Sequence, residues 1–166
     1  MGRLRTSHLP AQAVELHQWL LAGADELRPL RADLHKALAG RLAEDGTGPI
    51  VLVATELASN ALRHGLPPAM VRLLKSDDQF FLEVADRDLA SVPKLAEAYP
   101  SVSGGRGLHI ARSLSVEVCW YATERFKHVW ASFPSPQESS SQEAGPVEAD
   151  REEPEETSPG GPRTGR

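Results

Sequence analysis

The sequence has a single cysteine, few aromatic residues and no long hydrophobic run. Because Cys119 is alone, a disulfide framework and a cysteine-based metal cluster are excluded. Its position in an apolar segment favours a packed thiol over a nucleophile. The longest strongly apolar run, residues 50–54, is far too short to span a bilayer, and no apolar signal-peptide core follows the first five residues. We therefore expect a soluble, cytoplasmic protein with no membrane contact.

The net charge of the chain comes entirely from its C-terminal part. Residues 134–166 hold eight acidic and three basic side chains, a charge of −5, whereas the preceding 133 residues hold fifteen of each sign. A neutral body gives no electrostatic footprint for nucleic acid, so direct nucleic-acid binding is not expected. The last 33 residues also contain six prolines and four glycines with little apolar content. We expect one domain at residues 1–133 and a disordered acidic tail at 134–166.

Hydrophobic periodicity predicts a mixture of helices and strands. Helices are expected at residues 11–22, from 24 or 25 to 42, at 50–64 and at 108–114, with Leu108, Ala111 and Leu114 facing inward. Strands are expected at 69–75, 79–86, 116–121 and 128–133, with a short edge strand within 3–8. Residues 44–49 are expected to form a turn, after which Pro49 opens the third helix and Gly65 ends it. The long connection 87–103 is expected to hold one helical turn at 94–99.

Three polar residues in the third helix recur at intervals of four. Glu56, Asn60 and His64 therefore line up along one face of the helix, beside a stripe of apolar residues. Together they could accept a proton, bind a metal ion and donate hydrogen bonds. Taken alone, three such residues are better explained as a solvated helix face.

A glycine cluster precedes the last predicted helix, where residues 104–108 have the sequence G-G-R-G-L. Glycines let the backbone come close to an anion, and the helix that follows presents free N–H groups and the positive end of its dipole. Arg106 adds a planar cation suited to phosphate oxygens. A flexible loop explains this cluster equally well, and neither the Rossmann nor the P-loop pattern is present.

A bound triphosphate would need a divalent ion and a base-recognition group. Mg²⁺ takes oxygen ligands and few protein groups, so Asn60 could supply one neutral oxygen. Glu56, one turn earlier, could accept a proton from an attacking hydroxyl or water. Asp86, at the end of a strand, could accept a hydrogen bond from an exocyclic amino group and so select adenine. A turn-capping aspartate is an equally good explanation for Asp86.

Three motifs together resemble a known superfamily. The sequences E-L-A-S-N-A-L-R-H at 56–64, V-A-D at 84–86 and G-G-R-G-L at 104–108 resemble the N box and the two glycine boxes of the Bergerat ATP-binding fold. The resemblance covers residues 51–133 and is greatest to the bacterial anti-sigma-factor serine kinases. It implies an α/β (α+β) fold, a two-layer sandwich in which helices cover one face of a mixed, mainly antiparallel sheet.

The resemblance also implies roles for individual residues, with ATP and Mg²⁺ as cofactors. Glu56 resembles the general base, Asn60 the magnesium ligand and Asp86 the adenine-binding aspartate. Residues 87–103 would form a lid over the nucleotide. The phosphate-binding turn would comprise Gly105, Arg106, Gly107 and Leu108.

Two further residues are assigned less directly, and one motif departs from the family pattern. Lys127 lies where the family often has a polar or basic residue, and His64 is placed near the phosphates or ribose, although it could simply end the helix. The full first glycine box is D-x-G-x-G, whereas residues 86–90 have the sequence D-R-D-L-A. Because glycines there let the chain pass close to adenine, nucleotide affinity depends on what replaces them.

The leading hypothesis is an ATP-binding regulator that binds a sigma factor or an antagonist protein and phosphorylates a serine on the antagonist. In a second hypothesis ATP only maintains a partner-binding shape and no phosphate is transferred; in a third, nucleotide binding has been lost. A histidine autokinase fits less well, because His35 lies in a helix too short for a phosphoacceptor hairpin. A homodimer is compatible with each of these hypotheses.

Overall fold

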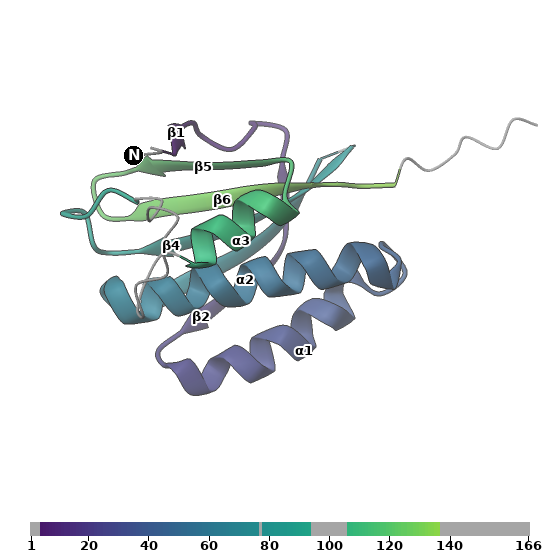
Figure 1. Ribbon diagram of the computed structural model, residues 1–166, viewed down its shortest axis with the longest axis horizontal. Helices are drawn as coiled ribbons and strands as arrows, with labels where there is room; N and C mark the ends of the chain where they lie inside the picture. The colour runs from purple at the N-terminus through teal and green to yellow at the C-terminus, as the bar shows by residue number, and fades with distance from the viewer. Residues whose placement is uncertain (1–3, 77, 94–105, 137–166) are drawn as a thin grey trace, which may run out of the picture.

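The computed structural model describes residues 4–76, 78–93 and 106–136 (Figure 1). In chain order the elements are β1 (Arg5–Thr6), β2 (Val14–Leu21), a 3-10 turn η1 (Ala24–Glu26), α1 (Leu27–Leu38), α2 (Glu44–His64), β3 (Ala69–Lys75), β4 (Gln79–Asp86), α3 (Arg106–Leu114), β5 (Glu117–Ala122) and β6 (Lys127–Pro134). In the described ranges, no helix combines the length and apolarity needed to cross a membrane.

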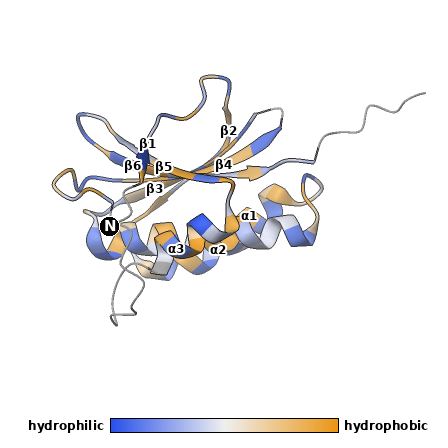
Figure 2. Ribbon diagram, turned by 45° about the horizontal axis from the view of Figure 1, so that its top comes forward, coloured by the Kyte–Doolittle hydropathy of each residue, from blue (hydrophilic) through white to orange (hydrophobic). Residues whose placement is uncertain are grey.

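The strands form one sheet, and the helices form a second layer on one of its faces (Figure 2). The strand order is β1-β5-β6-β4-β3-β2, and every neighbouring pair is antiparallel except β1 with β5. This arrangement confirms the predicted α+β sandwich with a mixed, mainly antiparallel sheet. The predicted edge strand near the N-terminus is also confirmed, because β1 lies at one edge of the sheet.

Strand β4 shows how the sheet divides its side chains between two faces. Phe80, Leu82 and Val84 belong to the core between sheet and helices, whereas Phe81 belongs to a smaller cluster on the other face. Because successive strand residues alternate, Asp86 continues the inward series and comes to the helix side at the end of the strand. The helices complete this inner core with α1 residues Leu30, Leu34 and Leu38 and with the apolar stripe of α2.

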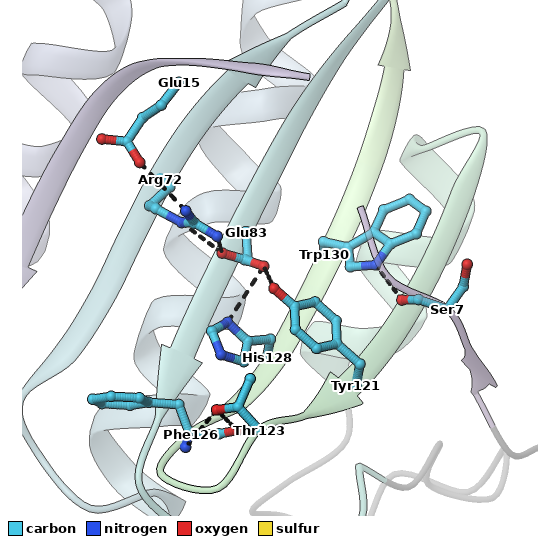
Figure 3. Close-up of polar contacts among 9 residues, drawn as sticks. All are labelled: Ser7, Glu15, Arg72, Glu83, Tyr121, Thr123, Phe126, His128 and Trp130. Atoms are coloured by element: carbon cyan, nitrogen blue, oxygen red, sulfur yellow. Dashed lines mark hydrogen bonds and ion pairs between the residues drawn. The ribbon is translucent and has the colours of Figure 1, made fainter. Parts of the chain in front are cut away.

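The outer face of the sheet is covered by the connection between β1 and β2. These strands lie at opposite edges, so residues 7–13 cross the sheet, and Leu9 and Ala13 pack on the outer cluster. The indole N–H of Trp130 donates a 2.7 Å hydrogen bond to the carbonyl of Ser7 (Figure 3). Cys119 is fully buried in this cluster, and burial raises the pKa of its thiol, which agrees with the expected packed cysteine.

A buried carboxylate lies at the centre of the outer face (Figure 3). Glu83 is fully buried and accepts hydrogen bonds from Nε of Arg72 at 2.7 Å and from the hydroxyl of Tyr121 at 2.6 Å. Nδ1 of His128 lies 3.3 Å from Oε1 of Glu83, an ion-pair distance, although the ring is poorly aligned for a hydrogen bond. Neighbouring strands therefore share one buried network of charged and polar groups.

The helix predicted at residues 11–22 is wrong, because the chain there forms strand β2. The register of β2 on β3 shifts between Glu15 and His17, which marks a β-bulge. With this extra residue, Leu16 and Trp19 both pack against the inner core although they are three positions apart. A spacing of three is typical of a helix, so the bulge gave the strand a helical pattern.

The turn predicted at residues 44–49 is also wrong. Helix α2 begins at Glu44, and Pro49 lies inside it. The amides of Gly46 and Thr47 both donate to the carbonyl of Ala43 at 3.0 Å, so the first turn closes before the proline is reached. Pro49 removes only the donor to Asp45, an exposed residue of that turn.

The remaining predictions differ from the structure only in detail or fall outside it. Helix α1 ends at Leu38 rather than residue 42, because Gly40 takes φ of 75° and stops the helix. Leu108 and Ala111 of α3 are buried as expected, but Leu114 is 37% exposed and does not face inward. The helical turn predicted at 94–99 and the tail from residue 137 onward lie outside the described residues.

Candidate functional site

A cavity of about 340 Å³ lies between α2, α3 and the ends of β4 and β6. Its volume falls in the range of small-molecule sites, which are mostly apolar with a few polar groups. The apolar lining comes from both layers, as Leu57 and Ala61 of α2, Leu108 of α3, Val84 of β4 and Val129 of β6. The polar lining comes from Asn60, His64, Asp86, Asp88, Ser91 and Lys127. The cavity therefore suits an apolar ligand with polar substituents.

Asp86 closes one end of the cavity. Asp86 is only 5% exposed, and it lines the cavity at the last position of β4. Gly65, the residue that follows α2, packs directly on it. A Cβ at Gly65 would lie 2.5 Å from Cγ of Asp86 and 2.5 Å from the carbonyl oxygen of Ala61, so only glycine leaves room for this carboxylate. Gly65 was expected only to end the helix, and its contact with Asp86 was missed.

Lys127 forms ion pairs with two carboxylates at this end. Asp86 and Lys127 are direct partners across β4 and β6. Nζ of Lys127 lies 3.3 Å from Oδ1 of Asp86 and 3.6 Å from Oδ2 of Asp88. All three residues line the cavity. The ammonium group of Lys127 is therefore held between the carboxylates of Asp86 and Asp88.

Asp88 replaces the first glycine of the expected box and shapes the loop by hydrogen bonding. Its amide donates to Oδ1 of Asp86 at 2.8 Å, and its own Oδ1 accepts from the amide of Ala90 at 3.2 Å. Such aspartate turns replace a conformation that glycine would otherwise supply. A hydrogen bond from Ser91 and the nearby charge of Lys127 lower the pKa of Asp88 against the effect of desolvation. The cavity thus exists without the box glycines, and sequence reasoning missed this role of Asp88.

Glu56, Asn60 and Gly107 meet where α3 crosses α2. A Cβ added to Gly107 would lie 2.5 Å from Nδ2 of Asn60 and 3.3 Å from Oε2 of Glu56. The glycine therefore lets the first turn of α3 approach both polar side chains. Asn60 also lines the cavity, so this junction adjoins its interior. The structure brings together these residues of two motifs that lie about fifty positions apart in the chain.

The other predicted residues have different surroundings. His64 is exposed at the last position of α2 and lines the cavity, whereas Leu108 is buried and forms part of its wall. Arg106 begins α3, but its side chain and all of Gly105 lie outside the described residues. Asp86 and Lys127 therefore line the cavity as a pair, and Asn60 connects the cavity to the α2–α3 junction.

Comparison with known proteins identifies a family. The sequence model described as the histidine kinase-like ATPase domain matches residues 20–133, which is more than half of the chain. The motif containing Glu56 and Asn60, the Asp86 motif and the described part of α3 all fall within this match. No curated protein matches the chain.

A solved structure has the same fold. It contains the RsbU and RsbW domains of a Mycobacterium tuberculosis protein, with a TM-score of 0.51 and 21% sequence identity. The match covers 72% of this chain and 33% of the other, so the chain corresponds to about a third of that structure. The expected family is confirmed by the sequence model, and the chain belongs to the histidine kinase-like ATPase domain family.

Proposed function

We propose that the protein is an ATP-binding regulator of the anti-sigma-factor type that transfers phosphate to a serine of an antagonist protein. One observation carries the proposal: Gly107 brings the start of α3 against Asn60 and Glu56 beside a cavity that ends at Asp86. This arrangement offers a base site, a phosphate site and a candidate general base in one place. Family membership and the resemblance to anti-sigma kinases support the same assignment.

In the proposed complex, the adenine and the phosphates of the nucleotide bind to different parts of the site. The apolar walls take the adenine ring, and Asp86 accepts a hydrogen bond from its amino group. The phosphates lie toward the start of α3, where the positive end of the helix dipole favours negative charge. The nucleotide would therefore run along α2 from Gly65 toward Glu56.

The residues present are suited to a magnesium ion. Mg²⁺ needs few protein ligands when phosphate oxygens and water complete its shell, and Asn60 supplies one amide oxygen. Gly107 leaves open the space that a Cβ would fill beside this amide. Within the described ranges no group of three His, Cys, Asp or Glu side chains could hold a metal by itself, which agrees with a site shared with the nucleotide. Mg²⁺ bound at Asn60 would neutralise charge on the phosphates.

Replacing Asn60 by alanine should weaken binding of ATP with Mg²⁺ by about tenfold, because one ligand interaction of about 1.4 kcal/mol is lost. Isothermal titration of the wild type and Asn60→Ala measures this change. Ser59→Ala is the matched control, because the Ser59 hydroxyl accepts hydrogen bonds from Arg63 on the same helix and does not line the cavity. Equal ATP affinity in the wild type and Asn60→Ala would contradict the site.

Gly107→Ala should weaken ATP binding more strongly, by about a hundredfold, because the new Cβ displaces the Asn60 amide and fills the approach to α3. The clash is with the end of a side chain, and alanine favours the helix by up to about 1 kcal/mol, so stability should not fall. Thermal melting with and without ATP measures both quantities. A melting temperature without ATP no lower than that of the wild type and a lost ATP-dependent increase are expected; a retained increase would contradict the proposal.

A second candidate is a binding module that holds ATP without transferring phosphate. The Asp88 and Ala90 positions favour it, because they replace both glycines of the expected box. An assay of radiolabel transfer from ATP to a serine of a candidate antagonist distinguishes the two functions, because only the kinase transfers label. Under either function the protein partner would be a sigma factor or its antagonist, and gel filtration would test whether the protein forms a homodimer.

A further inference from the structure

Lys127 lies beside Asp86, the residue proposed to bind the base, rather than at the α2–α3 junction proposed for the phosphates. It occupies the first position of β6, opposite Asp86 at the last position of β4. Its ammonium group contacts Asp86 and Asp88 at 3.3 and 3.6 Å, and its side chain is only 11% exposed. A lysine near bound ATP would ordinarily be assigned to the phosphates, but this position favours the adenine ring.

The charges around Lys127 favour a neutral ligand group. Two carboxylates, Asp86 and Asp88, surround one ammonium, so the cluster has a net charge of −1. A phosphate placed there would be repelled by both carboxylates in a site with little solvent to screen them. A neutral ring with hydrogen-bonding atoms meets no such penalty.

The hydrogen-bonding capacity of the cluster matches one edge of adenine. The amide of Asp88 and the ammonium of Lys127 both contact Oδ1 of Asp86, so Oδ2 can accept from a ligand. The ammonium group of Lys127 has three N–H donors. If Asp86 and Asp88 each accept one, the third is available for a ligand. The site therefore presents an acceptor beside a donor. On adenine, the N6 amino donor and the N1 acceptor are adjacent.

We propose that Lys127 recognises the adenine base, donating a hydrogen bond to N1 while Asp86 accepts one from the N6 amino group. This inference rests on the proposed ATP site and adds a second base-specific contact to it. Val84 and Val129, which precede and follow the two charged residues on their strands, line the cavity beside them and would pack against the ring. Lys127 would thus determine base specificity and leave phosphate affinity to α3 and Asn60.

The test compares nucleotides that differ only in phosphate number or in N1. Binding of ADP, ATP and 1-deaza-ADP, in which carbon replaces N1, is measured by displacement titration on the wild type and Lys127→Met. We expect Lys127→Met to weaken ADP and ATP by the same factor, about tenfold, and wild type to prefer ADP over 1-deaza-ADP by a similar factor. Lys127→Met should bind ADP and 1-deaza-ADP equally.

The double variant Lys127→Met/Asp88→Asn guards against a folding defect. It keeps the net charge of −1 at the cluster, because one positive and one negative group are removed together. It should fold and should show the same lack of preference between ADP and 1-deaza-ADP. A loss that grows from ADP to ATP would place Lys127 on the phosphates and overturn the inference, as would a wild type that binds both diphosphates equally. Failure of wild type to bind ATP at all would instead reject the proposed function.

Discussion

Glu56→Gln is expected to reduce phosphate transfer to the antagonist serine by about a hundredfold or more while leaving ATP binding nearly unchanged. A general base removes the proton from the attacking hydroxyl, and glutamine keeps the size of glutamate without its basicity. Oε2 of Glu56 lies 3.3 Å from the point that a Cβ on Gly107 would occupy, so the carboxylate borders the start of α3 where the phosphates are proposed to lie. Radiolabel transfer from ATP measures the rate, and titration measures binding.

Glu44→Gln is the matched control for this experiment. Glu44 lies in the same helix, but it is exposed in the first turn, three turns from the proposed phosphate site. It should therefore transfer phosphate at the wild-type rate. Equal rates for Glu56→Gln and the wild type would show that Glu56 is not the base. Magnesium-dependent ATP binding with no transfer in any variant would favour the binding module.

Much of the fold follows from local sequence pattern. The strand predicted at 69–75 is β3 without change, and the predicted hairpin at 116–133 is β5 and β6 within a residue at each end. These segments have plain alternation and clear turn residues, so their period is visible without tertiary information. The two segments whose predicted secondary structure was wrong each contain an irregularity that hides the expected periodicity. In β2 a bulge shifts the alternation, and in α2 a proline follows a turn that has already closed.

The sequence suggested candidate site residues mainly where a motif contains them. Glu56 and Asn60 share a helix face, so their alignment is dictated by the spacing of four. Gly65 and Asp88 were missed because their role is a contact with Asp86, and this depends on how α2 ends against β4. Lys127 was assigned to the nucleotide, but its ion pair with Asp86 was not predicted. That pair depends on the register between β4 and β6, and the two residues are 41 positions apart in the chain. Tertiary register has no local signature in a single sequence.

Glu83→Ala is expected to destabilise the protein by about 3–5 kcal/mol, lowering Tm by on the order of 10 °C or more. Glu83 is fully buried and is the shared partner of Arg72, Tyr121 and His128 (Figure 3). Removing it leaves a largely buried guanidinium without its main counter-ion and a buried hydroxyl without its acceptor. Thermal and urea unfolding measure the loss.

Glu15→Ala provides the control for the loss of Glu83. Glu15 also contacts Arg72, at 3.4 Å, but its side chain is 42% exposed, so its removal should cost less than about 1 kcal/mol. Glu83→Gln should fall between the two, because it keeps an acceptor oxygen for Tyr121 and loses the charge. Similar costs for Glu15→Ala and Glu83→Ala would contradict the assignment of Glu83 as the centre of the network.

The pH dependence of stability separates the charge of Glu83 from its packing. Burial alone would raise the pKa of this carboxyl, but the adjacent His128 imidazole, the hydrogen bond from Tyr121 and the charge of Arg72 lower it below its usual value. A carboxyl with a lowered pKa in the folded state stabilises the protein above the unfolded pKa, about 4.3, and loses that contribution as the pH falls through the folded value. The difference in unfolding free energy between wild type and Glu83→Gln should therefore be largest near neutral pH and shrink below about pH 4. A difference that stays constant down to acid pH would mean that the amide disturbs packing and that the charge contributes nothing.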